Sequence, residues 1–409
     1  MATNFGPNIK QDNLILGFDT GYGVADNETK TRFYTGEPTT NEFYGSGSDG
    51  NILDYASGYG GYGTAQTGAL DAFGTTENTV YRNTGKIRLG PTGGQDIGTL
   101  TNGNTYTFSV YLRHVPGQTR GTSMEFDIVD KADSRSYSGS LGGNMTYDWK
   151  RFSVTALHNN NSNYHFIDVG TYQGTNVWEW CMPQIETGSR ATPYCTTSRS
   201  NTQCLIDLAK TKDLSLANVS FDTTGQPTFD GSDDYIELGD ALNSIGPAAS
   251  FEFVFKATET VDHYRVLLGW GHGSNNYSGI HIGTWTSSYT DESFHATFNS
   301  STTHIYVRKG HGYYKDNAFH HAIVTAGENN YAIWIDGVDE TDTVVGGTNA
   351  FQEIVGYNSN ITAQVGKRPY GGGTGWFKGY IPVMKVYDKI LTNEEIKQNF
   401  KAYKNRFNI

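Results

Sequence analysis

The sequence is short of cysteine, of long apolar runs and of charge, and each shortage excludes a class of protein. Its 409 residues include three cysteines, Cys181, Cys195 and Cys204. Free thiols of a reducing cytoplasm are expected, although a Cys195–Cys204 disulfide is geometrically possible. No stretch is long enough to span a bilayer, and residues 1–7 lack the basic and apolar regions of a secretion signal. We expect neither membrane insertion nor Sec-type export.

Positive charge is also scarce. Lys and Arg number 30 against 42 Asp and Glu, which gives a formal net charge of -12. Because no basic face gathers along the chain, a nucleic-acid backbone is excluded as a partner, and a neutral glycan or a protein surface fits better. Charged residues make up 18% of the chain while glycines number 50 and aromatics reach 13%, which indicates a globular protein of many turns and packed β layers.

Short segments alternate between apolar and polar residues with the period of a β-strand. Residues 251–255 and 331–335 show this alternation in the C-terminal half, and residues 106–113 and 149–154 show it earlier. Asp336–Gly337 suits a tight hairpin turn. Short strands separated by such turns predict an all-β protein of two β-sandwich (jelly-roll) domains in tandem.

One helix is predicted, over residues 392–407 at the end of the chain. Thr392 can cap its first turn, and Glu395 can complete a capping box. Apolar residues recur at helical spacing and form one stripe that should dock on the sandwich: Ile396, Phe400, Tyr403 and Phe407.

Four segments follow from composition and length. We expect an N-terminal arm over residues 1–50, a β-sandwich over 51–195, a polar linker over 196–203 and a second sandwich over 204–409. The arm is too short to enclose a core, so it should pack on its own domain or on a partner. Its deletion is expected to leave both sandwiches folded.

The C-terminal half carries a family resemblance. Its strand-rich region opens with Phe229–Ile236 and closes with Gly379–Asp388, and residues 251–255, 320–325 and 364–366 stand between them. In this order the segments resemble concanavalin A-like (laminin-G-like) jelly rolls. The resemblance implies a lectin-type sandwich rather than an enzyme.

The middle of the chain is similar to carbohydrate-binding-module-like (galactose-binding-like) jelly rolls. Residues 106–113, 147–152 and 178–188 carry this likeness, and its ending, with Pro183–Glu186 and Ala191–Tyr194, resembles modules embedded in bacteriophage virion proteins.

A third resemblance links the N-terminus to the C-terminal half. Gly6–Ile9, Asp19 and Asp207–Leu208, with the segment at Phe229, resemble laminin-G-like structural proteins of tailed phages. In that pattern the N-terminal strand soon enters the sandwich, whereas another β domain intervenes here. Whether the arm completes the C-terminal sandwich or anchors elsewhere stays open.

Together these resemblances imply a non-enzymatic virion structural protein: a head decoration protein, a fibre protein or a tail adhesin. It would assemble in the bacterial cytoplasm, stand on the virion surface and bind host glycans. The arm would bind other virion proteins. The protein is also expected to form a homo-oligomer, and the expected oligomer is a trimer.

Exposed aromatics that stack on sugar rings are the candidate binding residues. Those beside Gly-, Asn- or Ser-rich loops are Trp285, Trp376, Tyr370, Trp270, Tyr313 and Tyr314, of which Trp285 and Trp376 come first. Trp149, Trp178, Trp180 and Trp334 lie within predicted strands and are assigned to the core. No cofactor is expected except calcium, for which Asp230, Asp233 and Asp234 could supply oxygen ligands, while a turn capped by these carboxylates is the alternative.

Motifs for catalysis are missing. Retaining glucanases of this fold resemble one another in a Glu-x-Asp-x-x-Glu strand, and Val345 replaces the second Glu in the nearest string, which starts at Glu340. Adjacent His320 and His321 should point to opposite faces of a strand and cannot share one metal ion. The alternatives left open are a secreted bacterial lectin or adhesin, a polysaccharide depolymerase whose carboxylates meet only in the fold, and a structural protein that binds no sugar.

Overall fold

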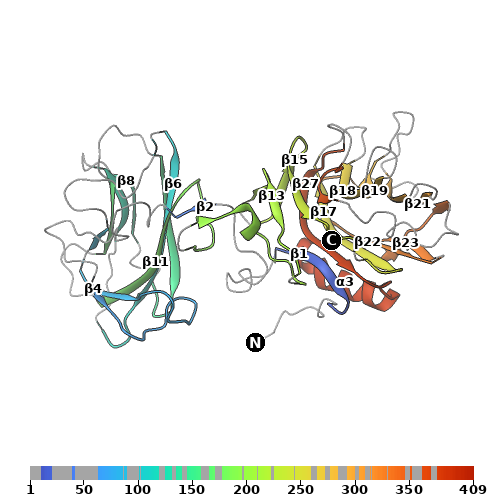
Figure 1. Ribbon diagram of the computed structural model, residues 1–409. Coiled ribbons are helices and arrows are strands. Elements are labelled where there is room, and N and C mark those ends of the chain that lie inside the picture. Colours follow the sequence, from blue (N-terminus) through green and yellow to red (C-terminus); the bar gives the residue numbers. More distant parts are fainter. Residues whose placement is uncertain are drawn as a thin grey trace. The chain divides into compact units, whose positions relative to one another are not determined.

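The computed structural model divides the chain into two compact units. Unit 1 joins residues 1–37 to 201–409, and unit 2 spans residues 38–200. Strands dominate both units (Figure 1). The residues described are 11–20, 39–41, 63–85, 87–89, 101, 103–118, 125–130, 135–140, 145–157, 165–170, 177–195, 198–209, 211–222, 225–243, 245–258, 265–271, 277–283, 293–299, 304–308, 314, 316–328, 330–345, 351, 362–369 and 375–409.

Unit 1 is a sandwich of two sheets, each with eight strands among the described residues. The first sheet has the order β14-β15-β27-β17-β22-β23-β24, and β1 also pairs with β27. Its strands are β1 (Leu14–Asp19), β14 (Ser220–Phe221), β15 (Pro227–Asp230), β17 (Ala249–Ala257), β22 (His320–Gly327), β23 (Asn330–Ile335), β24 (Val338–Asp339) and β27 (Lys378–Tyr387).

The second sheet has the order β13-β16-β26-β18-β19-β20-β21-β25. Its strands are β13 (Ser215–Ala217), β16 (Tyr235–Gly239), β18 (Arg265–Gly271), β19 (Tyr277–Ile282), β20 (Phe294–Asn299), β21 (His304–Arg308), β25 (Thr343–Val345) and β26 (Ala363–Val365). A short 3-10 helix, η2 (Asn201–Gln203), precedes β13.

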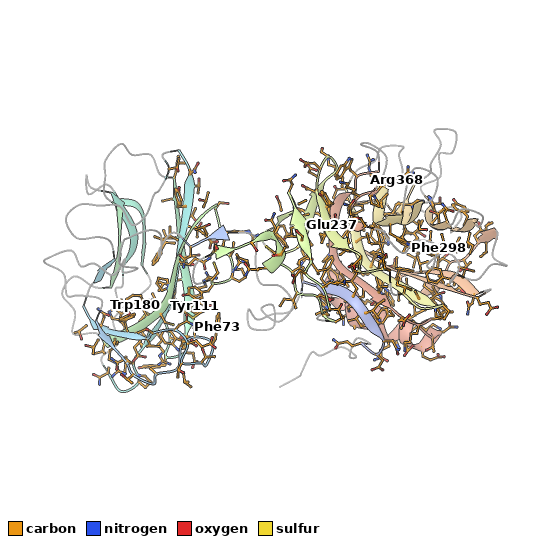
Figure 2. The ribbon with its side chains drawn as sticks, in the orientation of Figure 1. Phe73, Tyr111, Trp180, Glu237, Phe298 and Arg368 are labelled. Carbon is orange, nitrogen blue, oxygen red and sulfur yellow. The ribbon has the colours of Figure 1, made fainter. Side chains whose placement is uncertain are left out.

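The core of unit 1 fills the space between these sheets. Phe251, Phe253 and Phe255 are fully buried, as their alternation along β17 predicts. Phe251 meets Phe298 of the second sheet with ring centroids 6.1 Å apart, and Phe298 is labelled in Figure 2. The predicted hairpin turn is confirmed, because Asp336 and Gly337 have φ of 51° and 78°, the left-handed conformation that such a turn requires.

Helix α3 (Asn393–Phe407) covers the other side of the first sheet. Both bonds of the predicted capping box form: the Glu395 amide donates to Thr392 Oγ1 at 3.3 Å, and the Thr392 amide donates to Glu395 Oε2 at 3.0 Å. Ile396, Tyr403 and Phe407 are buried, so the predicted apolar stripe docks on the sheet as expected.

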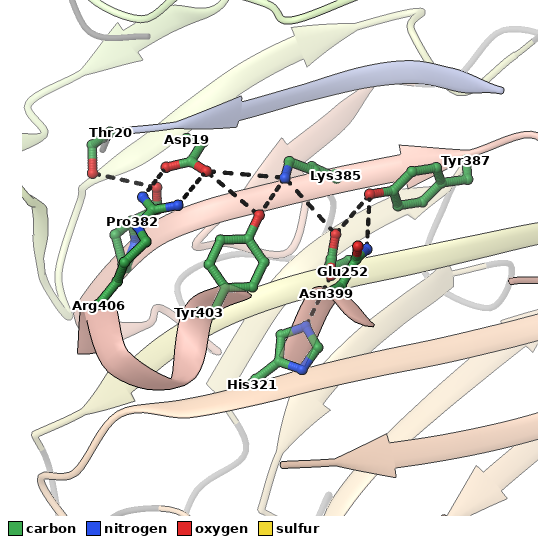
Figure 3. Close-up of polar contacts among 10 residues, drawn as sticks. All are labelled: Asp19, Thr20, Glu252, His321, Pro382, Lys385, Tyr387, Asn399, Tyr403 and Arg406. Atoms are coloured by element: carbon green, nitrogen blue, oxygen red, sulfur yellow. Dashed lines mark hydrogen bonds and ion pairs between the residues drawn. The ribbon is translucent and has the colours of Figure 1, made fainter. Parts of the chain in front are cut away.

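A buried polar network lies between α3 and the first sheet (Figure 3). Lys385 of β27 is 4.0 Å from the carboxylates of both Asp19 and Glu252 and donates a hydrogen bond to the Tyr403 hydroxyl. The Arg406 guanidinium donates two hydrogen bonds to the Asp19 carboxylate, at 2.5 and 3.0 Å. Because a buried charge without a partner costs several kcal/mol, this pairing ties β1, β27 and α3 together.

Glu252 also accepts a hydrogen bond from the Tyr387 hydroxyl at 2.8 Å and lies 2.9 Å from His321 Nε2. His320, by contrast, contacts Asp336 at 2.9 Å. The side chains of the two adjacent histidines therefore use different partners, as predicted for opposite faces of one strand.

The predicted N-terminal arm is divided between the two units. Leu16 and Phe18 of β1 belong to the core of unit 1. The outer edge of β1 is covered too, since Asp207 Oδ1 accepts a hydrogen bond from the Gly17 amide at 2.9 Å. β1 thus completes the C-terminal sandwich, which answers the open question. The expectation that deleting residues 1–50 leaves both sandwiches intact is wrong, because the deletion removes core residues.

Unit 2 is also a sandwich, with sheets of order β5-β10-β7-β8 and β3-β4-β11-β6-β9. Its strands are β2 (Thr39–Thr40), β3 (Thr64–Ala65), β4 (Tyr81–Thr84), β5 (Ile87–Leu89), β6 (Thr105–His114), β7 (Glu125–Asp130), β8 (Arg135–Ser140), β9 (Lys150–Leu157), β10 (His165–Gly170), β11 (Val177–Thr187) and β12 (Ser198–Arg199). The predicted two-sandwich fold is confirmed.

The chain enters and leaves unit 2 through one pair of strands. Thr39 of β2 pairs with Arg199 of β12. Asn41 fastens this pair to β11, because its side chain donates to the Pro183 carbonyl at 3.1 Å and accepts from the Ile185 amide at 3.0 Å. Part of the segment predicted as a linker, 196–203, is therefore paired strand, and residues 38–41 belong to unit 2 rather than to an arm.

Candidate functional site

The second sheet of unit 1 presents a polar outer face, the side away from the core. Ile236 and Leu238 of β16 lie in the core, so Glu237 between them lies on the outer face. By the same alternation the outer face carries Tyr235, Gln364, Gly269, Gly279, His281, His295, Thr297 and Tyr306. Polar side chains from five strands are thus gathered on one side of the sheet, where Gln364, His281 and His295 are buried.

At one edge of this face Lys367 lies between two aromatic rings. Its Nζ is 3.9 Å from the ring centroid of Tyr235 and 4.7 Å from that of Trp376. Gly366, with φ of 84°, makes the bend that places Lys367 there. All three side chains are half-buried, and burial lowers the pKa of Lys367 while the charge of Glu237 opposes that change. The rings can stack on the apolar C–H faces of a ligand, and the ammonium can donate hydrogen bonds to its oxygen atoms.

Glu237 and Gln364 stand next to this aromatic pair. The Gln364 amide Nε2 donates to Glu237 Oε2 at 2.6 Å, and the Gly239 amide donates to Glu237 Oε1 at 3.0 Å. Figure 2 marks Glu237 and Arg368 in unit 1. The arrangement offers acceptors for the hydroxyl groups of a ligand beside a stacking surface.

Two histidines pair across the same face. His281 and His295 are opposed on β19 and β20, with ring centroids 3.7 Å apart, and both are buried. Burial lowers the pKa of His295 to about 3, and burial together with His295 and Arg368 lowers the pKa of His281 as well. Both rings are therefore neutral near pH 7 and can offer a donor and an acceptor.

The structure places the aromatic residues that were predicted to bind sugar in different environments. Trp376 is half-buried and belongs to the group just described. Trp270 is a correction: it is 2% exposed and stacks on Phe251 at 5.3 Å within the core, so it cannot meet a sugar. Tyr314 is also buried. Trp285, Tyr313 and Tyr370 lie outside the described residues.

The three predicted calcium ligands do meet. Ligand atoms of Asp230, Asp233 and Asp234 lie within 4.8 Å of one another. Asp230 Oδ1 also accepts hydrogen bonds from the amides of Ser232 and Asp233 at 2.7 and 3.3 Å, and Asp234 Oδ2 accepts from the Asp230 amide at 2.7 Å. These are the bonds of the capped turn. Burial raises the pKa of Asp234 to about 6, and the Asp230 amide bond opposes that rise.

The string nearest to the glucanase motif, which starts at Glu340, leads into β25 at one end of the second sheet. Thr341 Oγ1 donates a hydrogen bond to Asp339 Oδ1 at 2.7 Å. Residues 340–342 lead into β25, which spans Thr343–Val345. Val344 of this strand is 41% exposed.

Sequence reasoning missed Tyr235, Glu237, Gln364 and Lys367. The alternation in residues 235–239 could have placed Tyr235 and Glu237 opposite the core. No sequence pattern could have placed Lys367 on this face, because its position depends on the bend at Gly366. In unit 2, Trp178 and Trp180 are buried as predicted, but Trp149 is half-buried beneath the Arg113 guanidinium, 4.3 Å from its ring centroid.

Comparison with protein families assigns part of unit 1. Residues 230–397 match the Concanavalin A-like lectin/glucanases superfamily. The chain therefore contains a lectin-like domain, and the first predicted resemblance is confirmed at this level. None of the curated proteins matches the chain. Among the described residues, no helix is long and apolar enough to cross a membrane.

Several solved structures share a distant likeness. The NanB sialidase from Streptococcus pneumoniae is 13% identical over 42% of this chain and 26% of its own, with a TM-score of 0.33. Domain 4 of AbnA, an extracellular arabinanase from Geobacillus stearothermophilus solved with arabinotriose, is 15% identical over 45% of this chain and 79% of its own, with a TM-score of 0.32.

The CBM40 of the Ruminococcus gnavus IT-sialidase, bound to alpha2,3 sialyllactose, is 15% identical over 37% of this chain and 80% of its own, with a TM-score of 0.30. The chain spans about a quarter of the sialidase that it matches. Similarity at this level assigns neither a ligand nor an activity.

Proposed function

We propose that this chain is a non-enzymatic glycan-binding protein whose site lies on the outer face of the second sheet of unit 1. One observation carries the proposal: Trp376, Tyr235 and Lys367 form a half-buried group beside the hydrogen-bonded pair Glu237–Gln364. A surface of aromatic rings next to fixed polar groups suits a sugar, because a pyranose ring has apolar C–H faces and a rim of hydroxyls.

The setting of the protein is proposed from the sequence resemblance alone. It would be a structural protein on a bacteriophage particle, as a head decoration protein, a fibre protein or a tail adhesin, with the lectin-like domain directed at glycans of the host surface. Symmetric positions on a particle favour a homo-oligomer, and a trimer is proposed. Detection of the protein by mass spectrometry in purified particles tests this setting.

Glycan-array binding by the full chain tests the site. Trp376→Ala should weaken binding by roughly tenfold, which corresponds to about 1.4 kcal/mol for a lost stacking contact. Val338→Ala is the matched control, because Val338 is a 55% exposed apolar residue on β24 of the same unit. The control should bind as the unchanged protein does.

An array without signal from a folded protein would contradict glycan binding. It would favour a purely structural role. Hydrolysis of an oligosaccharide on the array by the unchanged protein would contradict the non-enzymatic part of the proposal.

A further inference from the structure

Lys367 carries a positive charge that lies against aromatic rings instead of a carboxylate. Its ammonium Nζ is 3.9 Å from the ring centroid of Tyr235 and 4.7 Å from that of Trp376. Within the described part of the chain, Lys367 forms no ion pair, and its ammonium donates no hydrogen bond. An ammonium has three N–H donors, and the faces of two rings satisfy only part of them. The remaining donors are available to a ligand.

The carboxylate of Glu237 is close to Lys367 but does not pair with it. Its charge opposes the lowering of the Lys367 pKa that burial causes, so the two charges are near enough to interact. Both Glu237 oxygens accept hydrogen bonds from uncharged donors instead, the side-chain amide of Gln364 at 2.6 Å and the backbone amide of Gly239 at 3.0 Å. The local counter-charge is therefore held apart from the ammonium.

The backbone keeps Lys367 and Trp376 together. The Phe377 amide donates a hydrogen bond to the Gly366 carbonyl at 2.8 Å, and these two residues directly adjoin Trp376 and Lys367. The bend is fixed as well, because a Cβ atom on Gly366 would lie 2.5 Å from a ring carbon of Phe229. The ammonium and the indole ring are thus placed before a ligand arrives, which reduces the entropic cost of binding.

The charge of the ligand follows from these contacts. A neutral hydroxyl can accept a hydrogen bond from Lys367, but it brings no counter-charge. A carboxylate or a sulfate ester brings several acceptor oxygens and a negative charge, and the attraction of opposite charges is stronger at a half-buried site than in bulk water. Glu237 keeps lone pairs that can accept hydrogen bonds from hydroxyls of the same ligand.

The net charge of the chain does not oppose such a ligand at close range. The value of -12 led to the expectation of a neutral glycan. Salt screens the charges of a protein surface beyond about 8 Å at physiological ionic strength, so the charge next to the ligand matters more than the sum over the chain. At the Tyr235–Trp376 pair that neighbouring charge is the ammonium of Lys367.

We infer that this site binds an acidic glycan, with a sugar ring stacked on Trp376 and a carboxylate or sulfate group of that sugar bound to Lys367. Hydroxyls of the sugar bind at Glu237. Lys367 is then the residue that determines specificity. The inference rests on the proposed function and deepens it, since it names the charge of the glycan and the side chain that selects it.

The test compares variants of the full chain on an array of neutral, uronic-acid, sialylated and sulfated glycans. Lys367→Met keeps an apolar stem over the rings and removes the charge, so binding of acidic glycans should fall by roughly ten- to hundredfold. Lys367→Arg keeps the charge and should retain the preference for acidic glycans. Lys256→Met is the matched control and should bind as the unchanged protein does, because Lys256 Nζ also lies over two rings, those of Tyr380 at 4.3 Å and Phe319 at 5.1 Å, in the first sheet.

Salt gives a second readout that a purely structural lysine would not affect. The affinity of the unchanged protein for acidic glycans should fall as sodium chloride rises from about 50 to about 500 mM, whereas its affinity for neutral glycans should stay constant. Lys367→Met should lose this salt dependence. The measurement on the unchanged protein stands even if Lys367→Met folds poorly.

The outcomes separate this inference from the proposed function. Binding of neutral glycans that is lost in Trp376→Ala but kept in Lys367→Met would overturn the inference and leave the proposed function standing. An equal loss in Lys256→Met would overturn it too, because the net charge and not Lys367 would then determine the preference. Preference for the uronic-acid and sialylated glycans would assign a carboxylate, and preference for the sulfated ones a sulfate. A silent array would overturn both proposals.

Discussion

The carboxyl side chain of Asp234, which directly precedes β16, is almost completely buried. Burial raises its pKa to about 6 from its ordinary value of 3.8, so the folded protein binds a proton there more tightly than the unfolded chain does. Stability must then fall as the pH rises from about 4 to about 6 and remain lowered above that. Asp234→Asn should therefore stabilise the protein at pH 8 by on the order of 1–2 kcal/mol, since exposed neighbours are screened by water.

Chemical denaturation at pH 8 and pH 4.5 checks this, and the gain should shrink at the lower pH. The variant keeps an acceptor for the Asp230 amide, so the turn itself is preserved. If the three carboxylates hold calcium instead, calcium should raise the stability of the unchanged protein and Asp234→Asn should abolish that rise. Calcium ligation would contradict the capped turn.

At the residue scale the sequence predicted what depends on near neighbours. The Asp230 turn and the Thr392 cap lie within five residues of their partners, so local patterns sufficed. Trp376 was found because it follows a glycine run. Trp270 looked similar but lies in the core, since the loop signal beside it did not reveal that β18 continues to Gly271. Gln364 meets Glu237 only through strand pairing, which no local pattern contains.

Helix α3 covers the charges of the polar network, so its first turn matters for the sheet beneath. Thr392→Ala removes the side-chain acceptor of the cap, and such a loss costs about 1 kcal/mol. Hydrogen exchange of the amides in residues 396–407 should therefore speed up by roughly fivefold. Thr392→Ser keeps the hydroxyl and is the matched control. Equal exchange in both variants would contradict a role for the cap.

At the element scale, the strands and the helix could be predicted because their periods of two and 3.6 residues can be recognised within short stretches of the sequence. Pairing was harder. The polar network could not be predicted, since Asp19, Glu252 and Lys385 come from strands far apart in the sequence. Only the pairing of β1 and β17 with β27 in one sheet brings these side chains together.

At the scale of the whole molecule, unit 2 is an insertion within unit 1. Strand partners such as Thr39 and Arg199 lie about 5 Å apart, so the two ends of unit 2 meet. Replacing residues 38–200 by a short Gly-Ser linker should leave unit 1 folded, with its melting temperature within a few degrees of the original. Circular dichroism and calorimetry of the shortened chain check this. Aggregation of that chain, with residues 38–200 folded when expressed separately, would show that unit 1 needs the insertion.

The pairing of β1 with β27 also determines when unit 1 can fold during synthesis. Leu14 of β1 pairs with Tyr387 of β27, so β1 cannot pair until β27 has left the ribosome. At about 5–20 residues per second that wait is roughly 20–75 s. Unit 2, whose sequence is complete well before, can fold on the ribosome in this interval. Meanwhile Leu16 and Phe18 stay exposed to chaperones, and unit 1 closes only when β27 has been synthesised.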